Sequence, residues 1–333
     1  MVSCKLVSNL KPLQLKAITN NINGVSFSIA FSDTYLHQLT DNQADLAISP
    51  AQDLPYPLHS DFEVIALYHD FENIFQPSET NPLQGFLAVV VKRNRENLKQ
   101  LFADDNNILT KSGRVDLVGF GPGDPELLTI KAERLIKNAD IIFYDDLTNK
   151  EYLETIETEK VYVGKRSGKH SFEQQAINYM LLKSAREGKN VVRLKGGDPM
   201  LFAHAAEEIE YLQRCFINVG VTPGISAAFA AAAALRIPLT QRKISSSVAF
   251  INGHSKKIEM PNASTLVYYN MASSNLNEIR NVLINKGLAT DTPVMLVENV
   301  SKPTEKQYIT TLNNLSQNYQ TPLIVIVGEV GRR

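Results

Sequence analysis

The sequence has only two cysteines, and no apolar run in it approaches the roughly 18 residues that a membrane-spanning helix needs. The two thiols, Cys4 and Cys215, do not occur in a spacing typical of a zinc site. Sparse cysteine favours a reducing compartment, so we expect a cytoplasmic protein that binds no membrane and no metal. The first twenty residues carry Lys5, Lys11 and Lys16 without a continuous apolar core, which argues against a secretory signal.

A strong charge of either sign is also missing, because 34 Lys and Arg residues stand against 35 Asp and Glu residues. Residues 1–112 hold 8 basic and 12 acidic residues, so the remainder is mildly basic. Neither part has the strongly basic patch or stripe that nucleic-acid binding requires, although a small polyanionic ligand is compatible with the second part. A length of 333 residues predicts about two domains, and an apolar fraction of 44% is ordinary for a globular protein.

The unit that organises the chain lies between residues 115 and 145. An apolar strand at 115–118 leads into a turn that contains three glycines, and Asp145 follows the next predicted strand. Ligands bind at the carboxyl ends of strands in open α/β sheets, so a glycine-lined backbone and a carboxylate should share one edge. The spacing differs from the dinucleotide fingerprint, which needs its third glycine at Asp124. A nicotinamide cofactor and a plain tight turn remain alternatives at this point.

Strand and helix patterns alternate through the whole chain. Asp124 and Pro125 predict the start of a helix that ends near Asn138. A helix is expected over 92–102 and a linker over 104–113. Other strands are expected at 25–31, 44–48, 64–68, 86–91, 141–144, 160–163, 190–194, 247–252, 264–269, 293–298 and 323–329. The pattern predicts a small α/β domain over 1–112, followed by two α/β lobes over 113–223 and 224–333.

A second glycine turn follows the strand at 190–194. Gly196 and Gly197 would let the backbone approach a ligand, and Asp198, which precedes a proline, is expected to project its carboxylate from the strand end. A simple strand-to-helix turn is the alternative. Basic residues are expected at the neighbouring strand ends: Lys165, Arg166, Lys169 and Lys195, joined by Arg242 and Lys243. They form either a solvated edge or a cleft that binds several carboxylates.

Four motifs then occur in order: VGFGPGDPELLT, VGKRSGKHSFEQQAIN, VVRLKGGDP and TPGISAA, with IPLTQR following. Together they resemble the tetrapyrrole methylase family over residues 114–331, and the second motif is similar to members that methylate uroporphyrinogen III. The resemblance implies a two-lobed α/β homodimer that binds S-adenosyl-L-methionine between the lobes and releases S-adenosyl-L-homocysteine. It further implies two methyl transfers that convert uroporphyrinogen III to precorrin-2 for sirohaem and cobalamin biosynthesis, without a metal.

The resemblance also implies roles for individual residues. Asp145 matches the family's proton acceptor and Lys165 its proton donor. The cofactor would contact Pro122, Gly196, Gly197, Asp198, Leu201, Ser226, Ala227, Met271 and Val300. The tetrapyrrole carboxylates would be bound by Arg166, Lys169, His204 and Arg242. Several positions depart from the family: Asp146 replaces an arginine, residues 203–208 read AHAAEE instead of GRGGEE, Gln241 replaces a histidine and Val300 replaces a glycine.

Residues 1–112 are similar to a different family. The segment 43–55 (QADLAISPAQDLP) resembles the active-site segment of porphobilinogen deaminase, whose catalytic aspartate matches Asp53. Gln52 stands where that family has a basic residue, and no arginine precedes Arg93, although arginine is the best side chain for binding carboxylates. We interpret this region as a truncated, non-catalytic relative; an unrelated α/β module is the alternative. Two other hypotheses for the chain are a catalytically weakened tetrapyrrole-binding or scaffold protein, and a methylase of another corrinoid intermediate.

Overall fold

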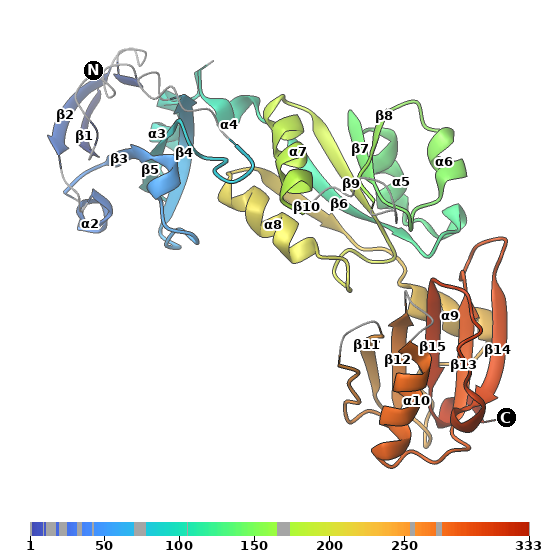
Figure 1. Cartoon of the computed structure of the whole chain (residues 1–333). Coiled ribbons are helices and arrows are strands. Elements are labelled where there is room, and N and C mark those ends of the chain that lie inside the picture. Colours follow the sequence, from blue (N-terminus) through green and yellow to red (C-terminus); the bar gives the residue numbers. More distant parts are fainter. Residues whose placement is uncertain are drawn as a thin grey trace.

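The computed structural model describes residues 2–8, 10, 18–19, 25–31, 35–41, 43–69, 78–104, 106–164, 174–253, 257–270 and 275–332. These residues form three five-stranded sheets that follow one another along the chain. In Figure 1 the first sheet is blue, the second runs from green to yellow and the third is orange to red. Helices accompany each sheet, so the predicted α/β class is confirmed.

The first sheet has the strand order β2-β1-β3-β5-β4. Its elements are β1 (Val2–Ser8), β2 (Val25–Phe31), α2 (Tyr35–Thr40), β3 (Leu46–Pro50), η1 (Ala51–Asp53), β4 (Phe62–His69), β5 (Phe86–Lys92), α3 (Glu96–Leu101) and α4 (Ile108–Lys111). The first three strands are parallel, whereas β5 is antiparallel to both of its neighbours. The sequence pattern did not predict β1, although Leu6 and Val7 in it are fully buried.

Two predictions for the end of this region are wrong. The helix expected over 92–102 begins only at Glu96, because Lys92 still belongs to β5. The expected linker over 104–113 contains α4, since the Asn107 side chain caps that helix by accepting a hydrogen bond from the Leu109 N–H at 3.0 Å. The same oxygen accepts one from the Leu67 N–H of β4 at 3.1 Å, which fastens the short helix to the sheet.

The second sheet is entirely parallel and has the order β10-β6-β9-β7-β8. Its strands are β6 (Arg114–Gly121), β7 (Ile141–Tyr144), β8 (Glu159–Tyr162), β9 (Asn190–Gly196) and β10 (Asn218–Thr222). Helices α5 (Ile130–Lys137) and α6 (Lys150–Glu154) pack on one face, and α7 (Gln174–Arg186) and α8 (Ala205–Arg214) pack on the other. Coverage of both faces explains why β7 and the centre of β9 are strongly apolar in sequence.

The helix predicted from Pro125 also begins later than expected. Asp124 accepts a hydrogen bond from the Glu126 N–H, but it caps only a single 3-10 turn, η2 (Pro125–Leu127). Leu128 is extended, and α5 starts at Ile130, where the Thr129 side chain accepts from the Ala132 N–H at 3.1 Å.

The third sheet is mixed and has the order β11-β12-β15-β13-β14. Its elements are α9 (Ala227–Leu235), β11 (Val248–Asn252), β12 (Thr265–Asn270), α10 (Leu276–Asn285), β13 (Pro293–Glu298), β14 (Lys306–Thr311), η4 (Leu312–Asn314), β15 (Leu323–Val327) and η5 (Glu329–Gly331). Helices α9 and α10 belong to different core clusters and cover opposite faces. The sequence pattern did not predict strands β10 and β14.

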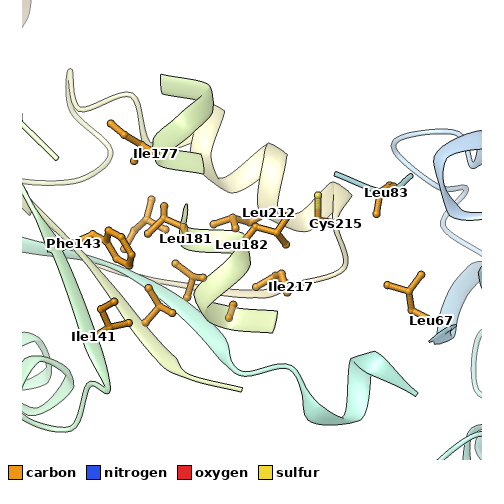
Figure 2. Close-up of a cluster of buried hydrophobic side chains, with 14 of the residues drawn as sticks. Leu67, Leu83, Ile141, Phe143, Ile177, Leu181, Leu182, Leu212, Cys215 and Ile217 are labelled. Atoms are coloured by element: carbon orange, nitrogen blue, oxygen red, sulfur yellow. The ribbon is translucent and has the colours of Figure 1, made fainter. Parts of the chain in front are cut away.

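The first region and the second sheet share one apolar core. Leu67, Leu83 and Phe86 belong to the same buried cluster as Leu212 and Cys215 at the end of α8. Figure 2 shows Leu83 close to Cys215, with Leu182 of α7 nearby. Residues 1–112 are therefore packed against the α7 and α8 side of the second sheet.

Candidate functional site

The carboxyl ends of β6 and β9 are joined through two glycines. The Gly121 N–H donates to the Gly197 carbonyl at 3.1 Å, and the Gly197 N–H donates to the Gly121 carbonyl at 2.7 Å. A Cβ at Gly119 would lie 2.6 Å from the Gly197 oxygen and 2.5 Å from the Gly224 nitrogen. Backbone from both strand ends and from the start of the third region therefore meets where a side chain would not fit.

The two glycines of the second turn have different surroundings. Gly197 has φ +69°, and a Cβ added there would meet no atom of the described residues within 4 Å, so this backbone borders open space that a ligand could enter. A Cβ at Gly196 would instead lie 2.4 Å from the Leu147 Cβ. Gly196 thus allows the loop that carries Asp145 to pack directly against this turn.

Asp198 does not project freely from the strand end, contrary to expectation. Its Oδ1 accepts a hydrogen bond from the Met200 N–H at 2.8 Å, and its Oδ2 accepts one from the Gly224 N–H at 3.0 Å. The second bond ties the end of β9 to the segment that leads into α9. The sequence could not reveal this partner, because it depends on how the second and third sheets meet.

Asp145 lies at the end of β7 with a quarter of its side chain exposed. One carboxylate oxygen accepts a hydrogen bond from the Leu147 N–H at 3.2 Å, and the other lies 3.3 Å from the Arg193 guanidinium. The carboxylate is therefore held in a fixed position and can still be reached from outside. A group that accepts a proton from a substrate needs both properties.

Behind Asp145 lies a buried network of charges. Arg193 lies 3.4 Å and Lys195 2.9 Å from the same carboxylate oxygen of Glu208, which is fully buried on α8. Lys195 also donates to the Ala203 carbonyl at 2.7 Å, and Gln174 of α7 donates to Glu208 at 3.1 Å. Burial and the charge of Arg193 lower the pKa of Lys195, whereas Glu208 opposes the shift. Lys195 is therefore buried, and of the two alternatives for the basic residues a solvated edge is excluded for this one.

The remaining predicted cofactor contacts lie on the α9 side. Pro122 and Ser226 are buried, Leu201 and Ala227 are half-buried, and Val300 is 7% exposed in the core of the third sheet. The Ser226 side chain caps α9, accepting from the Ala228 N–H at 3.4 Å, and its hydroxyl also pairs with the hydroxyl of Tyr269. Met271 lies outside the described residues.

Tyr269 is a further candidate site residue, which the sequence did not reveal. Its ring lies 5.1 Å from the ring of Phe202, which follows β9 and is 45% exposed. Burial raises the pKa of Tyr269, so its hydroxyl stays protonated at neutral pH. The contact between Phe202 and Tyr269 connects the loop after β9 with β12. In the sequence, both aromatic residues look like ordinary core side chains.

The predicted substrate contacts are only partly described. His204 is exposed at the start of α8 and lies 3.3 Å from Glu207, and Arg242 is exposed in the loop 240–246, which lines a cavity of about 540 Å³. Lys165, Arg166 and Lys169 lie outside the described residues. Asp146, where the resemblance implies an arginine, accepts a hydrogen bond from the Tyr162 hydroxyl at 2.5 Å.

Lys302 is a further cation that the sequence interpretation missed. A Cβ at Gly123 would lie 3.1 Å from its Cγ, so its side chain lies over the glycine turn after β6. Burial and the charge of Lys150 lower the pKa of Lys302, against the effect of Asp146.

Within the described part of the chain, no group of three His, Cys, Asp or Glu side chains could hold a metal ion. None of the described helices has the length and apolar character of a membrane span.

Comparison with known proteins connects this geometry to one family. A family model described as Tetrapyrrole (Corrin/Porphyrin) Methylases matches residues 114–316. The chain is 42% identical over 235 residues to the chloroplastic S-adenosyl-L-methionine-dependent uroporphyrinogen III methyltransferase of Arabidopsis thaliana, covering 66% of this chain and 63% of that protein. It is 41% identical over 235 residues to the uroporphyrinogen-III C-methyltransferase of Methanocaldococcus jannaschii, covering 66% of this chain and 97% of that protein.

A solved structure agrees with these matches. Uroporphyrin-III C-methyl transferase from Thermus thermophilus, complexed with S-adenyl homocysteine, superimposes with a TM-score of 0.58 at 36% identity. The superposition covers 66% of this chain and 99% of that one. The two-lobed fold predicted from the sequence is confirmed. The chain spans less than two thirds of the Arabidopsis relative, and the family model begins only after residues 1–112.

Proposed function

Because the chain belongs to the tetrapyrrole methylase family, we propose that it transfers methyl groups from S-adenosyl-L-methionine to uroporphyrinogen III. Two transfers to ring carbons would give precorrin-2, the intermediate that leads to sirohaem and cobalamin. The observation that carries the proposal is the open space beside Gly197, next to the loop that presents Asp145. Relatives of the same length as the matched part carry this activity in their names.

The residues around Gly197 fit the cofactor. A left-handed backbone with no side chain beside open space can form close contacts to a bulky ligand, as Gly197 does here. The cofactor would be held by Gly197 together with Pro122, Leu201, Ser226, Ala227, Met271 and Val300. Gly196 and Asp198 would act mainly as supports, through Leu147 and Gly224. When bound, the sulfonium supplies an electrophilic methyl group.

The protein's own part in the reaction is to align the substrate carbon and remove its proton. Asp145 would accept that proton on its partly exposed carboxylate, while Arg193 and the Leu147 N–H each hold one of its two oxygens in place. Lys165 would donate a proton, as the resemblance implies. Positioning of this kind contributes several kcal/mol, and a placed base contributes roughly 10²–10⁴-fold in rate.

Substrate recognition would depend on cations around the same edge. Arg166, Lys169, His204 and Arg242 are the proposed contacts for the carboxylates of the macrocycle. Lys302, over the glycine turn after β6, is an additional candidate for the positive charge that the family's arginine would supply where this chain has Asp146. Charge-assisted hydrogen bonds to carboxylates are about twice as strong as neutral ones, so a few such contacts suffice to orient the substrate.

Methyl transfer to uroporphyrinogen III tests the proposal directly. The full chain should release S-adenosyl-L-homocysteine only when the tetrapyrrole is present, and the variants Asp145→Asn and Lys165→Met should lose turnover. Cofactor binding, measured separately by calorimetry, should persist in both. Cofactor binding without turnover in the unaltered chain would reject the methyltransferase proposal.

That outcome would favour a second candidate function, a weakened tetrapyrrole-binding or scaffold protein. The shared core between residues 1–112 and α8 supports it, because it joins a deaminase-like region to the methylase part. Removing residues 1–112 separates the two functions: unchanged turnover together with unchanged capture of a pathway enzyme would exclude the scaffold. Methylation of another corrinoid intermediate would appear as turnover with that compound only.

The assembly and location follow as part of the same proposal. The exposed Phe229 of α9, which contacts the ring of Phe250 at 5.9 Å, supports a homodimer. Sedimentation should then give twice the mass of one chain. Both cysteines are free and buried, which supports the reducing environment of the cytoplasm.

A further inference from the structure

A separate pocket lies between the first region and α7, away from the carboxyl ends of the strands of the second sheet. It has a volume of about 250 Å³. Figure 1 shows that α4, which contributes to it, lies next to α7. Its walls come from the end of β4, the loop before β5, β5 itself, α4 and α7. The lining residues include Phe86, Leu182, Lys183 and Arg186.

The pocket combines apolar walls with positive charge. Lys111, Lys183 and Arg186 are basic, and no aspartate or glutamate is among the described residues that line it. Burial and the charge of Arg186 lower the pKa of His69, so this imidazole is a neutral hydrogen-bonding group at pH 7. Cations beside an apolar wall favour an anion that carries an apolar body.

Arg186 has hydrogen-bonding capacity that the described residues do not use. Its guanidinium stacks 4.6 Å from the centre of the Phe86 ring, and its Nη2 donates to the Cys215 carbonyl at 3.2 Å. Its Nη1 is buried and has no hydrogen-bond partner among the described residues. An unpaired donor on a buried charged group is costly. A ligand oxygen that reaches the guanidinium, after a small rotation of the side chain, would remove this cost.

We infer that this pocket binds a small organic carboxylate with a flat apolar body. The volume lies below the range of about 300–1,000 Å³ that holds drug-sized ligands, so only a few atoms fit. A planar guanidinium suits a carboxylate, and Phe86, Leu182 and Pro82 suit a ring better than a bare inorganic ion. The ligand would touch both the first region and α7, and would therefore strengthen their contact.

Calorimetry on the full chain tests this with benzoate as the probe. Benzyl alcohol has a similar shape without the charge, and inorganic phosphate has the charge without the ring. We expect benzoate to bind at least about tenfold more tightly than either, since a charged hydrogen bond is lost in one case and the apolar contact in the other. Benzoate should also raise the melting temperature of the chain more than benzyl alcohol or phosphate does at the same concentration.

Variants locate the binding. Arg186→Gln should weaken benzoate binding by about tenfold or more. Because Arg186 is partly buried, Lys183→Gln provides a second, exposed change that leaves the fold intact and should also weaken binding. Lys131→Gln, an exposed lysine on α5 at the opposite face of the sheet, is the matched control and should change nothing.

Four results would overturn the inference. They are no benzoate binding, equal binding of benzyl alcohol, tighter binding of phosphate than of benzoate, or benzoate affinity that Arg186→Gln and Lys183→Gln leave unchanged. Circular dichroism of each variant shows whether it is folded. None of these measurements requires methyl transfer, so the inference and the proposed function can fail independently.

Discussion

The guanidinium of Arg193 lies 3.3 Å from the carboxylate of Asp145. Arg193 extends from β9, is only 5% exposed and also contacts buried Glu208, so it cannot move freely. The proposed proton acceptor is therefore oriented by a charge network that reaches through the sheet to α8. The position of the Asp145 side chain therefore depends on buried residues of the second sheet and α8, and not only on the loop after β7.

Replacing Asp145 by asparagine should lower the kcat of methyl transfer by about a hundredfold or more, because the amide cannot accept the proton. Cofactor affinity, measured by calorimetry, should stay within about threefold. Asp146→Asn is the matched control, since Asp146 is the neighbouring carboxylate and its contact with Tyr162 can survive as an amide hydrogen bond. Equal losses of kcat in both variants would show that the turn, and not the base, had been damaged.

Glu208→Gln should destabilise the fold by about 3 kcal/mol or more, because the buried cations Arg193 and Lys195 would lose their shared counter-charge. Urea unfolding followed by far-UV circular dichroism measures the change as a lower midpoint. The adjacent Glu207 is exposed, and Glu207→Gln should change stability by no more than about 0.5 kcal/mol. Similar midpoints for the two variants would contradict a structural role for the network.

The sequence predicted most of the second sheet because its strands are buried on both faces. In β9, Val191, Val192 and Leu194 form an apolar run that contains one charged residue, Arg193. Such a run predicts a strand without knowledge of the neighbouring strands. The glycines at the ends of β6 and β9 were also recognisable, since glycine at a strand end permits a close approach. These features depend on residues near one another in the chain.

The partners of individual side chains could not be predicted in this way. Asp198 bonds to Gly224, which is 26 residues away, and only the meeting of the second and third sheets brings them together. The sequence left open whether Lys195 lies on a solvated edge or in a cleft that binds carboxylates, and it gave no sign that Glu208 on α8 compensates this charge in the interior. Distinguishing Gly196 from Gly197 likewise required the position of Leu147.

That difference gives a prediction about the cofactor. Gly197→Ala should lower S-adenosyl-L-methionine affinity about tenfold or more, because the new methyl group would fill the open space where the ligand is proposed to lie. Isothermal titration calorimetry measures the affinity. Gly287→Ala is the matched control: Gly287 also has a positive φ, at +96°, and a Cβ there also meets nothing within 4 Å. Backbone strain is similar in both variants, so equal affinities would argue against a ligand at Gly197.

Cys215 reports on the contact between residues 1–112 and the rest of the chain. Burial raises the pKa of its thiol from 9.0 to about 11, so about a hundredfold less thiolate is present at pH 8 than for an exposed cysteine. In a Cys4→Ser chain, alkylation at pH 8 should be slow and should accelerate as pH rises towards 11. A chain of residues 113–333 retains only this cysteine and should react much faster, since Leu83 no longer covers the cluster. Equal rates in the two proteins would mean that the first region does not protect α8.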